Sequence, residues 1–286
     1  STAATLNTAY ASSGITNLGN EAVTLSDTSL ASSVLNTLDG NTTGAVNAAT
    51  VLTLTGTAAA ANTAYASSGI SGLGNEAVTL SDTSLAAAVL NTLDGNTTGA
   101  VNAATITTFT SSTAATLNTA YASSGISGLG NEAVTISDTS LAATVLNTLD
   151  GNTTGAVNAA TVTTLTGLAA DANTSYASSG ISGLGDEAVT LSDTSLASTV
   201  LNTLDGNTTG AVNAATVLTL TGTAAAANTA LTSSGISNLG NEAVTLSDTS
   251  LAATVLNTLD GNTTGAVNAA TVTTLTGLAA DANTAY

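Results

Sequence analysis

The chain has 286 residues with no Lys, Arg or His, and its 18 acidic residues give it a formal net charge of −18. Without cations it cannot neutralise phosphates, which argues against nucleic acid and anionic membrane surfaces as partners. The absence of Cys excludes disulfides and thiol chemistry, and no apolar run is long enough to span a membrane. Hydrophobic residues make up 43% of the chain and charged residues 6%, a balance that opposes disorder.

One phrase, LDGNTTGAVNA, starts at Leu38 and returns unchanged with steps of 55, 56, 55 and 55 residues. A fixed period of this kind indicates a solenoid or an array. We therefore expect residues 1–286 to form one continuous solenoid segment of about five repeats. The copies lie near 15–69, 70–125, 126–180, 181–235 and 236–286. Because the sequence starts and stops inside a repeat, we expect it to be part of a longer array.

The first half of each repeat opens with a predicted strand. Val23 and Leu25 alternate with small or polar residues, which is the pattern of a short half-buried strand. The following SDTS supplies Asp27 and Ser29 as candidate N-caps of a helix.

The predicted first helix runs from Leu30 to Leu38, because its apolar residues recur at helical spacing. These residues are Leu30, Val34, Leu35 and Leu38. Gly40 stands just past them, where a left-handed C-cap is expected.

The second half of the repeat predicts another strand and another helix. TVLTLT, residues 50–55, is rich in β-branched residues, as strands are. An Ala-rich helix is expected from about Thr57 to Ala66, closed by Gly69. Tyr65 recurs in this helix, but one copy has Leu231 instead, which favours packing over chemistry.

Each repeat therefore predicts strand, helix, strand and helix. A strand, a crossover helix and a parallel strand make a right-handed unit, and tandem copies of it stack. We predict an α/β tandem-repeat solenoid with short parallel strands, short helices and about two rungs per repeat. A β-solenoid without helices is the alternative, which the Gly and Thr content favours and the apolar helical spacing opposes.

Two resemblances accompany these patterns. VTLSDTSL, residues 23–30, resembles the core of a leucine-rich repeat, with Thr28 at the Asn position, and LTLTGTAA, residues 52–59, is similar to it. The phrases GISGLGNEAVTLSDTSLAA and TTLTGLAADANTAY resemble the tandem repeats of giant secreted bacterial surface proteins, cyanobacterial ones among them. This second resemblance implies cell-surface, filament or adhesin roles.

The expected function is a structural, rod- or filament-forming repeat region of a secreted or cell-surface protein. Its expected partner is itself, end to end or side by side. Two alternatives stay open: an adhesin surface that binds polysaccharide or ice, and a rod that calcium rigidifies. We expect no enzyme, because the carboxylates recur with the repeat whereas an enzyme needs one site. Accordingly, no catalytic, cofactor-binding or metal-binding residue is assigned.

Three recurring polar positions nevertheless need an interpretation. Asp39, near a helix C-terminus, is either part of an Asp-Gly turn or a calcium ligand, and the turn is preferred because one Asp per turn is few for calcium. Glu21 is expected to be a solvated loop charge. Asn41 begins an N-glycosylation sequon in each repeat.

Overall fold

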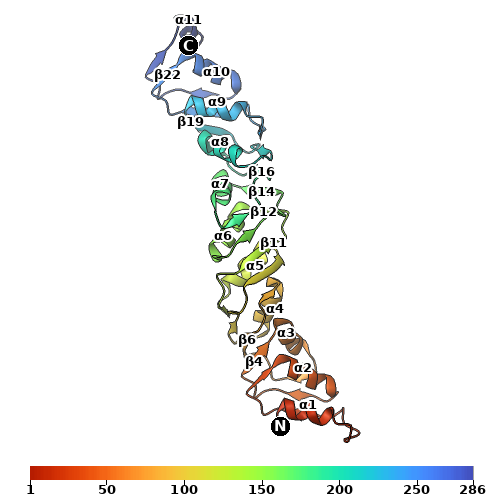
Figure 1. The fold of residues 1–286 in the computed structure, drawn as a ribbon. Helices are drawn as coiled ribbons and strands as arrows, with labels where there is room; N and C mark the ends of the chain where they lie inside the picture. The colour runs from red at the N-terminus through yellow and green to blue at the C-terminus, as the bar shows by residue number, and fades with distance from the viewer. Residues whose placement is uncertain (286) are drawn as a thin grey trace. The chain divides into compact units, whose positions relative to one another are not determined.

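The computed structural model describes residues 1–285. Over these residues the chain has eleven helices, and none of the sheets closes into a barrel. Figure 1 shows the helices alternating with short strands. The predicted α/β tandem-repeat solenoid is confirmed, and the β-solenoid without helices is wrong. The helices are α1 (Ala3–Tyr10), α2 (Ser32–Asn41), α3 (Ala58–Ala66), α4 (Ala87–Asn96), α5 (Ala114–Ala122), α6 (Ala143–Asn152), α7 (Ala169–Ala177), α8 (Ser198–Asn207), α9 (Ala224–Thr232), α10 (Ala253–Asn262) and α11 (Ala279–Ala285).

The strands are two to five residues long. The first twelve are β1 (Val23–Thr24), β2 (Ser29–Ala31), β3 (Val46–Asn47), β4 (Thr53–Gly56), β5 (Ile70–Ser71), β6 (Ala77–Leu80), β7 (Ser84–Leu85), β8 (Val101–Asn102), β9 (Thr108–Ser112), β10 (Ile126–Ser127), β11 (Ala133–Ile136) and β12 (Ser140–Ala142). The others are β13 (Val157–Asn158), β14 (Thr164–Gly167), β15 (Ile181–Ser182), β16 (Ala188–Leu191), β17 (Ser195–Ala197), β18 (Val212–Asn213), β19 (Thr219–Gly222), β20 (Ile236–Ser237), β21 (Ala243–Leu246), β22 (Ser250–Ala252), β23 (Val267–Asn268) and β24 (Thr274–Thr276).

The chain divides into two compact units. Unit 1 is Ser1–Ile136 with Gly151–Asn158, and unit 2 is Ser137–Asp150 with Ala159–Tyr286. In unit 1 each helix from α1 to α5 contacts the next one along the chain. In unit 2 the same holds from α7 to α11. Within each unit these helices therefore pack on their sequence neighbours, as in a stack of coils.

The sheets are parallel and run obliquely through the repeat. In unit 1 one sheet has the order β2-β4-β6-β8-β10, so it starts just before α2 and ends just after α5. Its core-facing partners lie 23 to 25 residues apart along the chain. They are Leu30, Leu54, Val78, Val101 and Ile126. In unit 2 the sheet β12-β14-β16-β18-β20 is built in the same way.

The core lies between these sheets and the helices. Leu54, Val78 and Val101 on the strands are fully buried, as are Leu35 and Leu38 on α2. The α3 helix contributes small residues instead, of which Ala58, Ala61 and Ala64 are buried. Stacked Leu and Val therefore alternate with Ala, which lets adjacent helices approach closely.

The first helix of the repeat begins later than predicted. It starts at Ser32, whereas Ser29–Ala31 forms strand β2, so Leu30 enters the core from a strand. Ala31 is the N-cap residue and makes no side-chain capping bond, so Asp27 and Ser29 do not cap this helix. The reason is that β2 pairs in parallel with β4. Residues Ser29–Ala31 therefore take an extended conformation and cannot form the first turn of the helix.

The predicted left-handed cap at Gly40 is also wrong. Gly40 lies inside α2, which continues to Asn41 and ends at an extended Thr42. The Thr42 hydroxyl donates to the Glu21 carbonyl at 2.7 Å, and this bond directs the chain toward β3.

The second predicted helix is confirmed at both ends to within a residue. It spans Ala58–Ala66, and the Thr57 hydroxyl accepts a bond from the Ala60 amide at 3.2 Å. Gly69 does not close it by a left-handed turn, because the helix ends at an extended Ser67.

The single 56-residue step is absorbed in one strand. β9 runs from Thr108 to Ser112, and its pairing with β11 shifts register between Val134 and Ile136, as a β-bulge does. The Ser112 hydroxyl then accepts a bond from the Ala87 amide at 3.1 Å, at the start of α4. The extra residue thus leaves the stacking of the following coil intact.

Candidate functional site

The glutamates expected in solvated loops are buried instead, so that expectation is wrong. Glu76, Glu132, Glu187 and Glu242 are all 0% exposed. Oε2 of Glu76 accepts bonds from the amides of Gly74 at 2.8 Å and Asn75 at 3.2 Å, and from the Tyr65 hydroxyl at 3.0 Å. Among the described residues, Oε1 of each of these four glutamates has no hydrogen-bond partner. The glutamate therefore holds its own loop and the preceding helix together.

Glu21, in the first coil, has the same arrangement but is half-buried. Its Oε2 accepts from the Gly19 amide at 2.7 Å, from the Asn20 amide at 3.1 Å and from the Tyr10 hydroxyl at 3.3 Å. The Gly19 amide and its own amide are the main causes that lower the pKa of Glu21, and the Asn20 amide and Tyr10 hydroxyl add to this. These donors favour the charged carboxylate.

The tyrosines are the donors of this cluster. Burial is the main cause that raises the pKa of the Tyr65, Tyr121 and Tyr176 hydroxyls; a hydrogen bond with the nearby Thr hydroxyl lowers this pKa, and the charge of the neighbouring glutamate raises it by a smaller amount. They therefore stay protonated and donate to Glu76, Glu132 and Glu187. At Glu242 the donor is missing because Leu231 stands in the tyrosine's place. Tyr286 lies outside the described residues.

The aspartates that follow the first strand cap a helix, but not the predicted one. Oδ2 of Asp82 accepts the amide of Ala58, the first residue of α3, at 2.8 Å. Ala3 with Asp27, Ala169 with Asp193, and Ala224 with Asp248 repeat this bond at the same distance. A carboxylate at a helix N-terminus satisfies a free amide and interacts favourably with the helix dipole. The prediction that these aspartates cap a helix is thus correct, but the predicted helix is wrong: each aspartate caps a helix that precedes it in the chain.

Asp39 forms neither the predicted turn nor a group of metal ligands. Its Oδ2 accepts the Ser67 hydroxyl at 2.6 Å, and the same bond joins Asp94 to Ser123, Asp150 to Ser178 and Asp205 to Ser233 at 2.7 Å. Within residues 1–285 no three Asp, Glu, His or Cys side chains come together as a metal site. A side chain at Gly69 would strike the Asp39 carboxylate, so the glycine makes this approach possible.

The repeated sequons are also used by the fold. Nδ2 of Asn41 donates to Oδ1 of Asn7 at 3.1 Å, and the Thr43 hydroxyl donates to the Gly19 carbonyl at 3.2 Å. A glycan on Asn41 would replace one of the two hydrogens on the Nδ2 that makes this bond. No membrane-length apolar helix occurs in the described part of the chain.

The outward face of the sheets carries rows of hydroxyl and amide groups. In unit 1 the parallel register places Thr55, Thr79, Asn102 and Ser127 side by side, and the last three are exposed. In unit 2 the equivalent row is Thr166, Thr190, Asn213 and Ser237. Adjacent strands lie about 4.8 Å apart, so each row is a regular polar comb. The rows cross the sheet rather than run along one strand, which is why the sequence alone did not reveal them.

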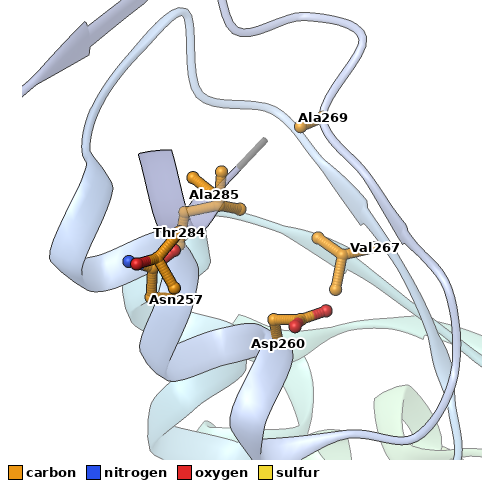
Figure 2. Close-up of a pocket in the computed structure, with 7 residues that line it drawn as sticks. Asn257, Asp260, Val267, Ala269, Thr284 and Ala285 are labelled. Atoms are coloured by element: carbon orange, nitrogen blue, oxygen red, sulfur yellow. The ribbon is translucent and has the colours of Figure 1, made fainter. Parts of the chain in front are cut away.

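A pocket of about 330 Å³ opens at the last coil of unit 2. Figure 2 shows Asn257 and Asp260 from α10, Val267 from β23, and Thr284 and Ala285 from α11 around it. Asp260 is the last member of the Asp39 series. Its carboxylate is exposed here, whereas the carboxylates of the earlier members bind a serine.

Comparison with known proteins adds no identification. No protein-family model matches the chain, and neither a curated protein nor a solved structure is significantly similar to it. The resemblances to leucine-rich repeats and to secreted bacterial surface repeats therefore stay predictions.

Proposed function

We propose that this chain is a structural repeat region, rod- or filament-forming, of a secreted or cell-surface protein. The observation that supports this most directly is how the polar side chains are used. Glu76, Asp82 and Asp39 each bind a group from another coil or loop, and their equivalents do so repeat after repeat. A chain whose acidic groups mostly join its coils is suited to bearing a mechanical load or to acting as a spacer, and not to catalysis.

The composition supports an exposed setting. A chain without Lys or Arg offers no cleavage site to proteases that require a basic residue. A chain without Met, Cys or Trp lacks the side chains that oxidise most readily. Both properties are useful to a protein that is not renewed inside a cell.

Circular dichroism in EDTA, followed by calcium addition, tests whether the coils are self-sufficient. We expect a mixed helix and strand spectrum in EDTA and no change on adding calcium, because the glutamates and most of the recurring aspartates already have protein donors. A coil spectrum that folds only with calcium would replace this proposal with the calcium-rigidified rod.

A second candidate function rests on the polar rows of the sheets. An adhesin surface for polysaccharide needs many weak, regularly spaced hydrogen-bonding groups, and the rows of Thr79 and Thr190 offer them. Retention on cellulose, chitin or ice tests this function. Retention lost in the Thr79→Val, Thr190→Val double variant and kept in Thr92→Val, whose hydroxyl lies on the exposed side of α4, would support it. Absence of retention on all three would remove it.

A further inference from the structure

The exposed hydroxyl groups of the helices and those of the sheets differ in how they are bonded. Each of the eleven helices carries an exposed Thr whose hydroxyl donates to the backbone carbonyl four residues earlier, as Thr92 does to Ala88 at 2.8 Å. On the sheets, the hydroxyls of Thr79 and Thr190 are exposed and have no hydrogen-bond partner within residues 1–285. The sheets, and not the helices, therefore offer unused hydrogen-bonding groups.

Thr79 belongs to a row of three exposed polar side chains, which we call a Thr-Asn-Ser row. In β6, β8 and β10 the parallel register places Thr79, Asn102 and Ser127 side by side. Oδ1 of Asn102 accepts the Ala104 amide at 3.1 Å, which leaves its Nδ2 as a donor. The Ser127 hydroxyl donates to the Val101 carbonyl at 3.3 Å, which leaves its oxygen as an acceptor. The row therefore presents donors and acceptors at steps of about 4.8 Å.

The Thr-Asn-Ser row recurs in other repeats. Two further copies are Thr24 with Asn47 and Ser71, and Thr190 with Asn213 and Ser237. Oδ1 of Asn47 accepts the Ala49 amide at 3.0 Å, and Oδ1 of Asn213 accepts the Ala215 amide at 3.1 Å. The Asn side chain is thus held in the same way each time. The chain repeats one set of hydrogen-bonding groups, which suits a ligand that is itself repetitive.

The strands are free of charge and, on their outward face, of aromatic rings. Across β1–β24 there is no Asp or Glu, although the chain has 18 acidic residues. Phe109 is the one aromatic residue in these strands, and it is fully buried. A ligand on the Thr-Asn-Ser rows is therefore held by hydrogen bonds, and not by ion pairs or ring stacking.

We propose that the Thr-Asn-Ser rows bind a neutral polysaccharide at an ordered surface of packed chains. This inference rests on the second candidate function, the adhesin surface, and specifies its ligand. A hydrogen bond to an exposed group replaces one to water and contributes little by itself, so the ligand must present many hydroxyls at fixed spacing. An acidic polysaccharide would be repelled by the net charge of −18, which no Lys, Arg or His offsets. Neutral sugar hydroxyls both donate and accept, as the three members of a row require.

Asn102→Asp combined with Asn213→Asp separates ligand binding from folding. Asp keeps the oxygen that accepts the Ala104 or the Ala215 amide, so the local fold is retained. The exposed Nδ2 donor, however, becomes a charged oxygen. The double variant therefore removes a donor from two rows and places a charge on the neutral face of the sheets.

Asn75→Asp combined with Asn241→Asp is the matched control. It adds the same two charges in the loops that precede β6 and β21, outside the Thr-Asn-Ser rows. The chain itself has Asp186 at the equivalent position before β16, so a charge there is compatible with the fold. The two double variants thus differ in where the charge lies and not in its amount.

Retention of the full chain on crystalline cellulose and on chitin is the primary measurement, with surface-carboxylated cellulose as the acidic counterpart. We expect retention on a neutral polymer, and at least about tenfold weaker retention on the carboxylated one at low salt. Asn102→Asp with Asn213→Asp should weaken retention on the neutral polymer at least about tenfold, and the control should leave it unchanged.

Three outcomes would overturn the proposal. Equal losses in the two double variants would show that net charge, and not the rows, decides retention. Retention on ice but on neither neutral polymer would replace the ligand and leave the adhesin function. A chain that is folded by circular dichroism and retained on none of these solids would remove the adhesin function as well and leave the structural one. If the Asn102→Asp, Asn213→Asp variant loses its helix and strand spectrum, Thr79→Val with Thr190→Val takes its place.

Discussion

At the scale of single residues, the glycines differ sharply in what they allow. Gly99 has no left-handed φ, yet a Cβ there would lie 2.3 Å from the Glu76 carbonyl oxygen, which is backbone and cannot move aside. A Cβ added to Gly95, inside α4, would meet no neighbouring atom within 4 Å. One glycine permits a close approach of two loops, and the other only lowers helix propensity.

Gly99→Ala and Gly95→Ala should therefore change stability in opposite directions. We expect Gly99→Ala to destabilise by about 2–3 kcal/mol through forced separation of the loops, and Gly95→Ala to stabilise by about 0.5–1 kcal/mol. Urea unfolding followed by circular dichroism measures both. Equal effects of the two substitutions would show that the close approach to Glu76 is not tight.

The buried glutamate should matter more than the tyrosine that binds it. Glu76→Ala leaves the amides of Gly74 and Asn75 and the Tyr65 hydroxyl without their acceptor, which we expect to cost about 3 kcal/mol. Tyr65→Leu should cost only about 1 kcal/mol, because Leu231 naturally holds that place above Glu242. Urea unfolding of both variants would contradict this ranking if Tyr65→Leu were the more damaging.

At the scale of elements, the aspartate bond links one coil's loop to another coil's helix. Asp82→Ala should destabilise by about 1 kcal/mol, the usual cost of losing a helix cap, since the Ala58 amide at the start of α3 loses its acceptor. Hydrogen exchange should place the loss at α3 and not at α4, the next helix along the chain from Asp82. Loss of protection at the start of α4 instead would restore the cap predicted from sequence.

The sequence predicted elements better than their boundaries. Alternation at Val23 and Leu25 and the Ala-rich run at 58–66 are local patterns, and both were predicted correctly. The spacing of Leu30 to Val34 predicts that Leu30 lies in a helix, but its pairing with Leu54, 24 residues away, places it in a strand. A local pattern of apolar residues carries no information about a pairing partner that far along the chain.

The polar positions were harder to predict for the same reason. A Glu between Asn and Ala reads as a loop charge, and only the fold shows that Tyr65, 11 residues earlier, and two amides surround Glu76. The Ser67 partner of Asp39 lies 28 residues further on. A signal was present in the fixed spacing of these Asp and Ser residues from repeat to repeat, although spacing alone does not distinguish a bond from coincidence.

At the scale of the whole molecule, the tyrosines set an alkaline limit. Burial raises the pKa of Tyr65, Tyr121 and Tyr176 in the folded chain, so their neutral forms are favoured there. Their contribution to stability is complete below the unfolded pKa of about 10 and is lost as pH rises through the raised values. The urea concentration at the unfolding midpoint should therefore be lower at about pH 11 than at about pH 8. Folded-state tyrosine absorbance that titrates at the ordinary pH would contradict this.

The oblique sheets have a mechanical consequence. In unit 1 the stretch after α3 supplies β5, β6 and β7 to three different sheets, and in unit 2 the stretch after α9 supplies β20, β21 and β22 to three different sheets. Each of these two stretches therefore ends one sheet, continues a second and begins a third. A pull that separates two coils must break ladders in several sheets at once, with their hydrogen bonds loaded in parallel rather than one after another. In the proposed structural role, this staggering of the sheets would leave no preferred plane at which the coils separate.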